Sequence, residues 1–334
     1  MTINKTQGQE LSFKDDIEAE FGKSGERRLG KYRTSDTGFG NKNLGELSNL
    51  PLDTGIPTSG EIKFSDFYGK KMNIVVDLFS SGNTNFNLDI YADRFAGGDY
   101  KIVGNHKSSI AKSQWRGGKK VIIHINKIFG SVNATDKNDV AVKTGNINNS
   151  VNSAGWPSDT SFSIDVGSSG IVAGKGGNGG DTGNEESGGE NGGNGSSAMK
   201  IVSGMQNVIS IQSGGAIVAG GGGGGSGSGS EQNDSSIFGS DYNSASGGGG
   251  GGGAGVPAGT GGTTGGVASA NPGQPGGQQD GGNGGDGGND AEANGGDGGN
   301  GGDPGQDGGN ATGGGSLAGN NGLGGEGGEQ FLFY

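Results

Sequence analysis

Few residues in this sequence could carry catalytic chemistry. The chain has two histidines, His106 and His124, and no cysteine, so a disulfide framework and a thiolate metal site are both excluded. Trp115 and Arg116 precede His124 closely enough to suggest a sugar site, but a packed aromatic and an ordinary strand histidine explain these residues better. Because no nucleophile, base and orienting group can be paired, we expect that the protein is not an enzyme and needs no cofactor.

Carboxylates are the remaining candidates for metal chemistry. Asp297 and Asp303 lie near each other in a glycine-rich stretch, but a Ca²⁺ site needs about 6–8 converging oxygens. The repeat of a calcium β-roll does not fit either, because its large apolar position is occupied here by Gly183 or Gly288. We therefore predict no metal site.

Composition divides the chain into two parts. There are 84 glycines in 334 residues, and most of them follow residue 150. All 23 Lys and Arg residues lie at or before Lys200, so the net charge of −12 belongs to residues 201–334. An acidic stretch without basic residues cannot neutralise phosphates, so we expect no nucleic-acid partner. No apolar run reaches the ~18 residues of a membrane helix, and residues 1–9 lack the apolar stretch of a secretion signal, so we expect no membrane insertion.

Two similar motifs occur near the N-terminus. Residues 10–15 (ELSFKD) and 61–66 (EIKFSD) both follow the pattern Glu-[Leu/Ile]-x-Phe-x-Asp. The first continues into a predicted short helix that ends at Gly22. Each unit has too few apolar residues for its own core, so the units either pack on the next domain or dock the chain to a larger assembly. We predict an attachment segment over residues 1–70, with the contact residues Phe13, Phe21, Phe64, Phe67 and Tyr68.

Strand signals dominate residues 71–160. Residues 73–79, 86–91 and 120–126 are short apolar or alternating runs bounded by turn-forming residues. They predict a small antiparallel β-domain, most simply a sandwich. A strand-to-glycine unit follows twice, at 162–174 and 209–220, and both copies end in Ile-Val-Ala-Gly before a glycine run.

Glycine recurs with a period of three in the C-terminal half. Gly-Gly-X runs, with Asn, Asp or Glu at X, occupy residues 176–181, 188–194, 281–289, 295–303 and 324–329. This period matches a polyproline-II-type helix, which has about three residues per turn and no internal hydrogen bonds. Its N–H and C=O groups need lateral partners, and glycine both supplies the donor and permits close approach. We predict a polyglycine-II helix bundle over residues 161–334, with the pure-glycine runs 220–225 and 247–253 inside and X at the solvent edge.

Other glycine-rich structures remain to be weighed. A collagen helix is excluded because it needs abundant proline, and the chain has 7 prolines. A flexible linker stays an alternative, because ordering the backbone costs about 1–2 kcal/mol per residue and only a dense hydrogen-bond lattice could offset that cost. An ice-binding bundle is a further alternative, which the acidic edge disfavours.

The segments between the glycine runs are polar, contain proline or carry isolated aromatics. Since proline lacks the donor that a lattice needs, we interpret segments such as 226–246 and 256–280 as loops at the ends of the bundle. Loops on a rigid scaffold commonly carry binding residues. The candidate receptor-binding residues are Phe238, Asp241, Tyr242, Asn271, Gln274 and Gln278. The apolar end, residues 331–334, is expected to be tucked into the fold.

Two parts of the chain resemble known proteins. Residues 56–70 (IPTSGEIKFSDFYGK) are similar to a phrase of structural proteins of large tailed bacteriophages, including cyanophages. The glycine-rich half resembles the polyglycine-II sandwich adhesins at the long tail-fibre tips of T-even-type phages. In that family variable loops bind bacterial surface proteins or glycans, so no binding residue can be transferred.

The resemblance implies a virion tail-fibre or tail-tip protein that attaches to the host cell surface. Its expected partners are other tail or fibre proteins and a host surface protein or glycan, and its expected location is the virion after synthesis in the host cytoplasm. A purely structural fibre or decoration protein without receptor binding is the alternative. A homotrimer, which is usual for fibres, and a monomer that caps a fibre both fit the sequence.

Overall fold

The structure is a computed structural model. It describes residues 3–18, 20, 28–32, 55–57, 59–71, 74–78, 86–87, 100–103, 120–131, 134, 136, 138–144, 158, 160–182, 188–201, 207–236, 239–265, 269–290, 293–314, 318 and 320–333. Several residues discussed above lie outside these ranges: Phe21, Gly22, His106, Trp115, Arg116, Gly183 and Phe238.

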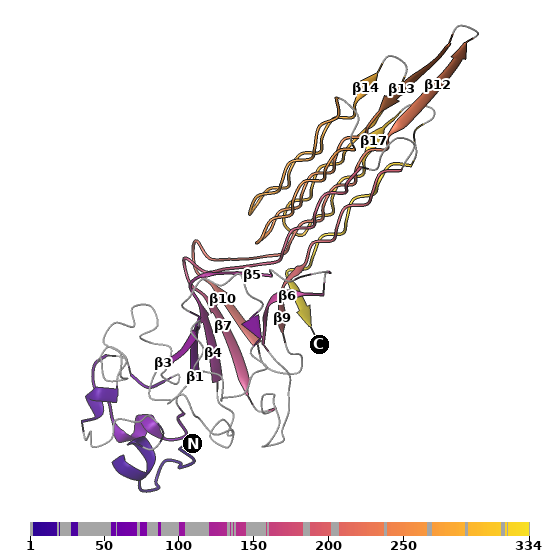
Figure 1. The fold of residues 1–334 in the computed structure, drawn as a ribbon. Coiled ribbons are helices and arrows are strands. Elements are labelled where there is room, and N and C mark those ends of the chain that lie inside the picture. Colours follow the sequence, from indigo (N-terminus) through magenta and orange to yellow (C-terminus); the bar gives the residue numbers. More distant parts are fainter. Residues whose placement is uncertain are drawn as a thin grey trace.

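The fold is mainly β, with very little helix, and it has two visibly different parts (Figure 1). The N-terminal segment and a stack of strands form a broad base, and a narrow rod of glycine-rich chain extends from it. Within the described residues, none of the helices has the length and apolar character needed to cross a membrane.

The N-terminal segment has a core of its own. It contains the π-helix η1 (Phe13–Glu18) and the 3-10 helices η2 (Leu29–Tyr32) and η4 (Phe64–Phe67). Ile17, Tyr32 and Phe67 are fully buried in one cluster. The rings of Phe13 and Phe64, which hold the same position in the two repeated motifs, meet edge to face at 4.7 Å. The two motifs therefore build jointly the core that neither could build alone.

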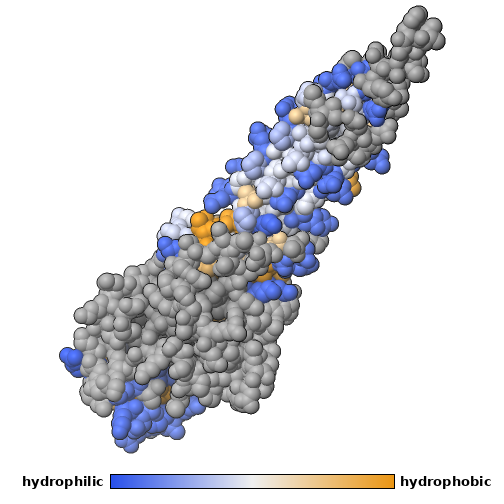
Figure 2. All heavy atoms as spheres, in the orientation of Figure 1, coloured by the Kyte–Doolittle hydropathy of each residue, from blue (hydrophilic) through white to orange (hydrophobic). Residues whose placement is uncertain are grey.

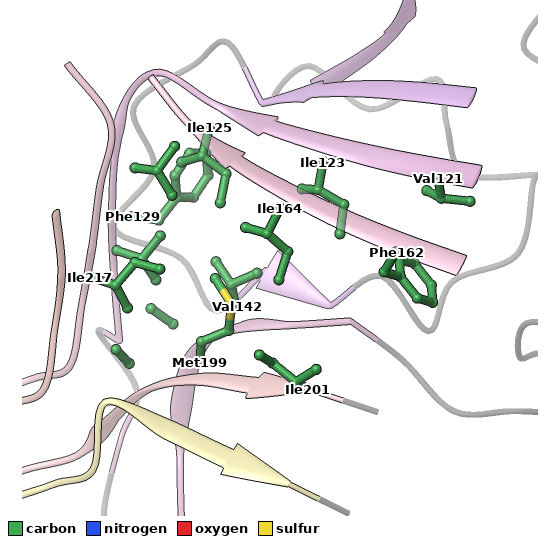
Figure 3. Close-up of a cluster of buried hydrophobic side chains, with 14 residues drawn as sticks. Val121, Ile123, Ile125, Phe129, Val142, Phe162, Ile164, Met199, Ile201 and Ile217 are labelled. Atoms are coloured by element: carbon green, nitrogen blue, oxygen red, sulfur yellow. The ribbon is translucent and has the colours of Figure 1, made fainter. Parts of the chain in front are cut away.

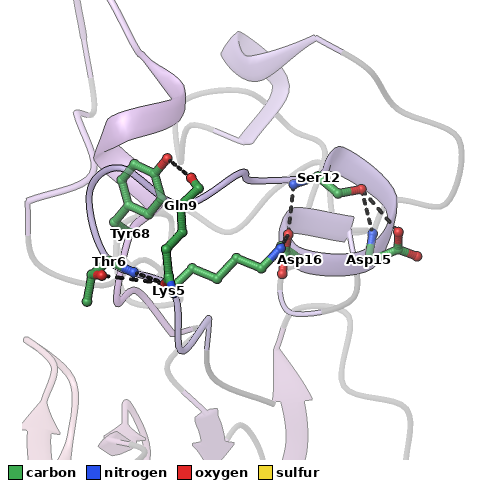
Figure 4. Close-up of polar contacts among 7 residues, drawn as sticks. All are labelled: Lys5, Thr6, Gln9, Ser12, Asp15, Asp16 and Tyr68. Carbon is green, nitrogen blue, oxygen red and sulfur yellow. Dashed lines mark hydrogen bonds and ion pairs between the residues drawn. The ribbon is translucent and has the colours of Figure 1, made fainter.

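Carboxylates accept main-chain N–H groups at the starts of η1 and η4, and Figure 4 shows the contacts at η1. Asp16 accepts the main-chain N–H of Ser12 and the side chain of Lys5, each at 2.7 Å. In the second motif, the main-chain N–H of Lys63 donates to Asp66 at 2.7 Å. These side chains satisfy donors that a helix start leaves without a partner.

The strands of the base stack as successive coils of a parallel β-solenoid. The strands are β1 (Ile74–Leu78), β2 (Phe86–Asn87), β3 (Tyr100–Val103), β4 (Lys120–Ile125), β5 (Ile128–Gly130), β6 (Val140–Lys143), β7 (Ser161–Val166), β8 (Ile171–Ala173), β9 (Ser197–Ile201), β10 (Asn207–Ile211), β11 (Ala216–Val218) and β18 (Phe331–Phe333). They form three sheets, in the orders β10-β7-β4-β1-β3, β11-β8-β5 and β18-β9-β6-β2. Thus β4, β5 and β6 make one coil, β7, β8 and β9 make the next, and β10, β11 and β18 make the last.

The prediction of an antiparallel β-domain over residues 71–160 is wrong about strand direction. Only the β1–β3 pair of the base is antiparallel among the described pairs, while the stacked coils pair in parallel. The sheets also continue beyond residue 160, since β4 pairs with β7. Alternating apolar residues report which face of a strand is buried, but they carry no information about the direction of its neighbour.

The repeated strand-to-glycine unit consists of corresponding parts of adjacent coils. Ile164 of β7 lies opposite both Ile123 of β4 and Ile209 of β10. Inward-facing side chains from the three sheets fill the coil interior, where Phe129, Phe162 and their neighbours are buried (Figure 3). Phe331 of β18 packs against this cluster, which confirms the expected tucked position for this residue; Tyr334 lies outside the described residues.

The rod arises from two excursions that leave the coils at corresponding points. Residues 174–196 lie between β8 and β9, and residues 219–330 lie between β11 and β18. The parallel pairing of β8 with β11 continues into the rod, because Gly177 donates to the carbonyl of Gly221 and Gly180 to that of Gly224, both at 2.9 Å. The stacked coils therefore start the glycine runs side by side.

The rod is built from extended runs joined by main-chain hydrogen bonds. The runs are 174–182, 188–196, 219–229, 246–256, 257–265, 269–277, 281–289, 293–303, 306–313 and 320–329. Runs 219–229 and 246–256, which contain the pure-glycine stretches, are buried throughout, as predicted. In the outer runs burial repeats every three residues, so that X is exposed and the glycine before it is buried, as at 281–286.

The X side chains perform a role that the sequence did not predict. Along one rim, the Oδ1 atoms of Asp297, Asn300 and Asp303 accept the main-chain N–H groups of the neighbouring run, at residues 287, 284 and 281, over 2.8–3.1 Å. Asn191 and Asn194 cap residues 323 and 326 in the same way. At these rims, Asn and Asp side chains at X thus accept main-chain N–H groups in the way that the carbonyls of a neighbouring run do inside the rod.

Residues 256–280 are wrongly predicted as a loop, because they contain two runs of the rod. In run 269–277, Gly273 and Gly276 donate to the carbonyls of residues 262 and 259, each at 3.0 Å. Pro272 and Pro275 directly precede these two donors and are exposed. Proline is tolerated because it occupies a solvent-facing position of the period, where the lattice requires no donor.

Candidate functional site

The end of the rod farthest from the base carries the candidate site (Figure 1). Two strands, β12 (Ser230–Ser236) and β13 (Gly239–Ala245), form an antiparallel hairpin there. They continue the two buried runs, 219–229 and 246–256, which we call the spine. Segment 226–246, which was predicted as a loop at one end of the bundle, therefore contains a paired hairpin at that end.

The hairpin keeps the register of the spine. Gly221 donates to Ala254, Gly224 to Gly251 and Gly227 to Gly248, over 2.8–2.9 Å. Ser230 opposite Ala245 and Ser236 opposite Gly239 are further steps of the same antiparallel register. Because a one-residue slip would displace every partner, the buried runs determine how the hairpin is presented.

Several chain reversals gather at this same end. The outward run 174–182 meets its return at the Thr182–Gly189 bridge. One short strand pair flanks the reversal at 291–292, and a second places residue 313, where connection 314–320 begins, beside residue 296. These pairs join β14 (Asn289–Asp290) to β15 (Ala293–Asn294) and β16 (Gly296–Asp297) to β17 (Thr312–Gly313). The connections at 183–187, 266–268, 291–292 and 314–320 therefore all start and finish at the far end.

Buried serines lie where the spine meets these connections. Ser226, Ser228, Ser230 and Ser246 are at most 2% exposed. Ser226 Oγ donates to the carbonyl of Asp181 at 2.7 Å, and Ser230 Oγ donates to that of Asn294 at 2.8 Å. The sequence analysis missed these residues, because the Gly-Ser alternation at 225–230 is typical of a flexible linker.

The surface of the rod is hydrophilic on the face that Figure 2 shows. Asn, Asp and Glu at the X positions are exposed along the rims. The exposed Leu323, at 58%, is an exception within the described part of the rod. On this face, a partner of the described part of the rod would therefore meet mainly polar groups and main chain.

The predicted receptor-binding residues do not all lie at one end. Asp241 and Tyr242 belong to β13, opposite Asp234 and Asn233. Asn271 and Gln274 lie in run 269–277, where both are exposed. Gln278 is at the opposite end, next to Gly277, whose carbonyl accepts the N–H of Gly255 close to the base.

The predicted attachment residues occupy different environments. Phe67 is fully buried in the N-terminal core, so it cannot touch a partner in this fold. Phe64 is 38% exposed. Phe13 and Tyr68 are partly buried, and the Tyr68 hydroxyl donates to the carbonyl of Gln9 at 2.5 Å. Phe64 is therefore the most accessible of the four described aromatics.

The residues considered for chemistry have structural partners. His124 is buried in β4, and its Nδ1 lies 2.7 Å from Oδ2 of Asp165 in the adjacent β7. Asp297 and Asp303 cap main-chain donors of the rod. Among the described residues, no group of three His, Asp or Glu side chains is placed to hold a metal ion.

Comparisons with known proteins connect this architecture to phage tails. A family model described as "Phage tail fibre adhesin Gp38" matches residues 79–331. A solved structure, the gp37-gp38 adhesin tip complex of the bacteriophage S16 long tail fiber, contains a chain that is 16% identical, with 92% of this chain and 94% of that chain covered at a TM-score of 0.30. No curated protein matches the sequence.

Proposed function

Since this chain belongs to the phage tail fibre adhesin Gp38 family, we propose that it attaches the virion to the host cell surface through the far end of its rod. The observation that carries this proposal is the rigid register of the spine, which ends in a hairpin surrounded by chain reversals. Binding residues are commonly presented in this way, on connections held by a stiff scaffold. The protein acts in this role by binding, without catalysis.

We infer that the runs of the rod are polyglycine-II helices packed as a three-layer sandwich. The inferred outer layers are 188–196, 174–182 and 257–265 on one side, and 306–313, 293–303 and 281–289 on the other. The middle layer is 320–329, 219–229, 246–256 and 269–277. Lateral main-chain bonds in several directions and the three-residue burial period support this assignment.

Amide hydrogen exchange tests the sandwich. Amides of the spine should exchange orders of magnitude more slowly than those of connection 183–187, because they are bonded and buried. Uniformly fast exchange across residues 174–329 would instead support a flexible linker.

We propose that the N-terminal segment, residues 1–70, attaches the chain to another tail-fibre protein. The family match begins at residue 79, beyond this segment, and the segment has a separate core with an exposed Phe64. The homotrimer usual for fibres stays a prediction, which a mass measurement in solution decides.

A hairpin replacement tests receptor binding. Residues 231–244 are replaced by Asn-Gly, which closes a two-residue hairpin turn between Ser230 and Ala245. The wild-type protein should bind host cells and compete with infection, whereas the variant should bind at least about tenfold less with an unchanged spine, the loss of ~1.4 kcal/mol of binding free energy.

Two outcomes contradict the proposal. If the wild-type protein neither binds cells nor competes with phage, it is not the adhesin. If phage that carry the shortened hairpin infect the same hosts with the same efficiency, the hairpin does not contact the receptor. Unchanged infection after replacement of every far-end connection would favour a purely structural fibre protein.

A further inference from the structure

We propose that Ser226, Ser228, Ser230 and Ser246 are positioning residues that tie the far-end connections to the spine. This inference rests on the proposed function and specifies how the binding surface is held. Each of the four serines lies in the spine or at its junction with the hairpin, and each bonds to a chain segment that begins or ends a different connection.

Ser226 joins both flanks of connection 183–187. Its Oγ donates to the carbonyl of Asp181 and accepts the main-chain N–H of Glu190, each at 2.7 Å. A single hydroxyl thus uses its donor and acceptor capacity together. The separation of the outward and return chains is fixed at the point where they leave the lattice.

Ser228 performs the same task for connection 314–320 through Asn321. The Asn321 Oδ1 atom accepts the Ser228 main-chain N–H at 3.1 Å and its hydroxyl at 3.0 Å. The Asn321 Nδ2 atom then donates to the carbonyl of Gly313 at 3.0 Å. The two ends of this connection are therefore both tied to the spine.

The other two serines each hold one end of a connection. Ser230 Oγ donates to the carbonyl of Asn294, which follows connection 291–292, at 2.8 Å. Ser246 Oγ donates to the carbonyl of Gly265, which precedes connection 266–268, at 3.2 Å. The set of four thus reaches a described flank of each of the four connections that surround the hairpin.

The lattice explains why serines occur here and not lower in the spine. A Cβ on Gly223 would lie 1.9 Å from the carbonyl oxygen of Asn178, and one on Gly250 would lie 2.0 Å from that of Gly224. Glycine is required wherever runs surround the spine. At the far end of the spine, the surrounding runs turn away into the connections. A buried main-chain group that loses its main-chain partner there needs a side-chain partner, because leaving it without a hydrogen bond is costly.

The consequence is a division between scaffold and contact surface. The bonds hold the flanks, at residues 181, 190, 265, 294, 313 and 321, through a carbonyl oxygen, an N–H or the Asn321 amide. These flanks lie just outside the connections 183–187, 266–268, 291–292 and 314–320 in the sequence. The residues of the connections can therefore change with the receptor while the spacing of the connections stays constant.

The test compares two buried serines at opposite ends of the rod in the full-length protein. Ser226→Ala removes the hydroxyl between Asp181 and Glu190. Ser196→Ala is the matched control, because Ser196 is 2% exposed and its Oγ accepts one main-chain N–H, from Lys175 at 2.8 Å, near the base. Hydrogen exchange, cell binding and the thermal midpoint are measured for both variants.

We expect the two variants to lower the thermal midpoint by similar amounts. Only Ser226→Ala should accelerate exchange of the Glu190 amide by about tenfold or more, because this N–H then keeps only its longer bond of 3.3 Å to the Asp181 carbonyl. Only this variant should also weaken cell binding by a similar factor. The proposal is overturned if Glu190 exchanges at its wild-type rate in Ser226→Ala, or if Ser196→Ala weakens binding equally. If the wild-type protein binds no cells, the proposed function fails, and the exchange rate of Glu190 alone decides whether the serine positions the connection.

Discussion

Ser230 lies directly opposite Ala245 in the register that the glycine runs below it have already established. From Gly221 paired with Ala254 near the base, each step outward on one run is matched by an equal step on the other. No side chain selects this register within the pure-glycine stretches. It is determined at the base, where the stacked coils fix the start of the first run, and is transmitted to the hairpin by main-chain bonds.

An alanine in the spine should disrupt the rod. In Gly223→Ala, the new Cβ would lie 1.9 Å from the Asn178 carbonyl oxygen, and main chain cannot withdraw without separating two runs. We expect a loss of unfolding free energy of about 3 kcal/mol or more, the upper range for overpacking. Denaturant unfolding measures it. Gly277→Ala is the control, because its Cβ would meet nothing closer than 3.6 Å; an equal loss there would contradict the lattice.

The strand that completes the last coil should stabilise the base. Phe331→Ala removes a partly buried ring that packs on the coil core, and we expect a loss of about 1–3 kcal/mol, below the ~3–5 kcal/mol typical of a fully buried phenylalanine. Leu323→Ala, at a side chain that is 58% exposed, should change the thermal midpoint little. Equal effects of the two substitutions would show that β18 does not close the coil.

The two phenylalanines of the second N-terminal motif should respond differently to truncation. Phe67→Ala empties a fully buried site and should cost the N-terminal core about 3–5 kcal/mol. Phe64→Ala should cost less, because that ring is 38% exposed, and should chiefly weaken attachment to a tail-fibre partner. Limited proteolysis of residues 3–71 and a pull-down with purified fibre proteins separate the two effects. Normal attachment by Phe64→Ala would exclude this ring from the contact.

Asp16 should make the N-terminal segment sensitive to acid. Burial raises the pKa of its carboxyl, but hydrogen bonds from Lys5 and the Ser12 N–H, with the Lys5 charge, outweigh burial and hold the pKa below 3.8. Because the folded-state pKa is the lower one, the carboxylate's contribution is present above about pH 4 and is lost as pH falls through the folded-state pKa. In Asp16→Asn, pepsin susceptibility of this segment should depend less on pH between about 4 and 2.

An exposed ion pair provides the control for the acid experiment. Lys63 and Glu61 are 3.3 Å apart, with side chains that are 59% and 76% exposed. Such pairs contribute little to stability, so Lys63→Ala should leave the pH profile unchanged. A profile altered equally by both substitutions would mean that general charge, and not the Asp16 contacts, governs acid unfolding.

Sequence reasoning succeeded where a pattern has one physical meaning. Glycine at every third position predicted buried runs with X at the rim, because only an extended chain with lateral bonding needs that period. It failed where a residue type has two meanings. Pro272 was taken as a break, although proline also fits a solvent-facing lattice position. Ser226 was taken as part of a loop, although its hydroxyl is buried and bonded.

Strand direction and the boundary at residue 160 could not be predicted for a related reason. The alternation in residues 120–125 indicates which side chains face a core, and Ile123 is indeed buried. It does not indicate that β7, from beyond the predicted boundary, is the parallel neighbour. The residues of a strand do not identify a neighbouring strand that comes one coil later in the chain.

The bond between Asn191 and the Leu323 N–H connects residues 132 positions apart. Contacts of such long range are slow to form, because the entropy of closing a large chain loop is lost before any bonding is gained. Assembly of this rod should therefore be a slow step, during which unpaired glycine runs are exposed to the wrong neighbours. Helper proteins that hold the chain during this interval would increase the yield of the native rod without altering its final stability.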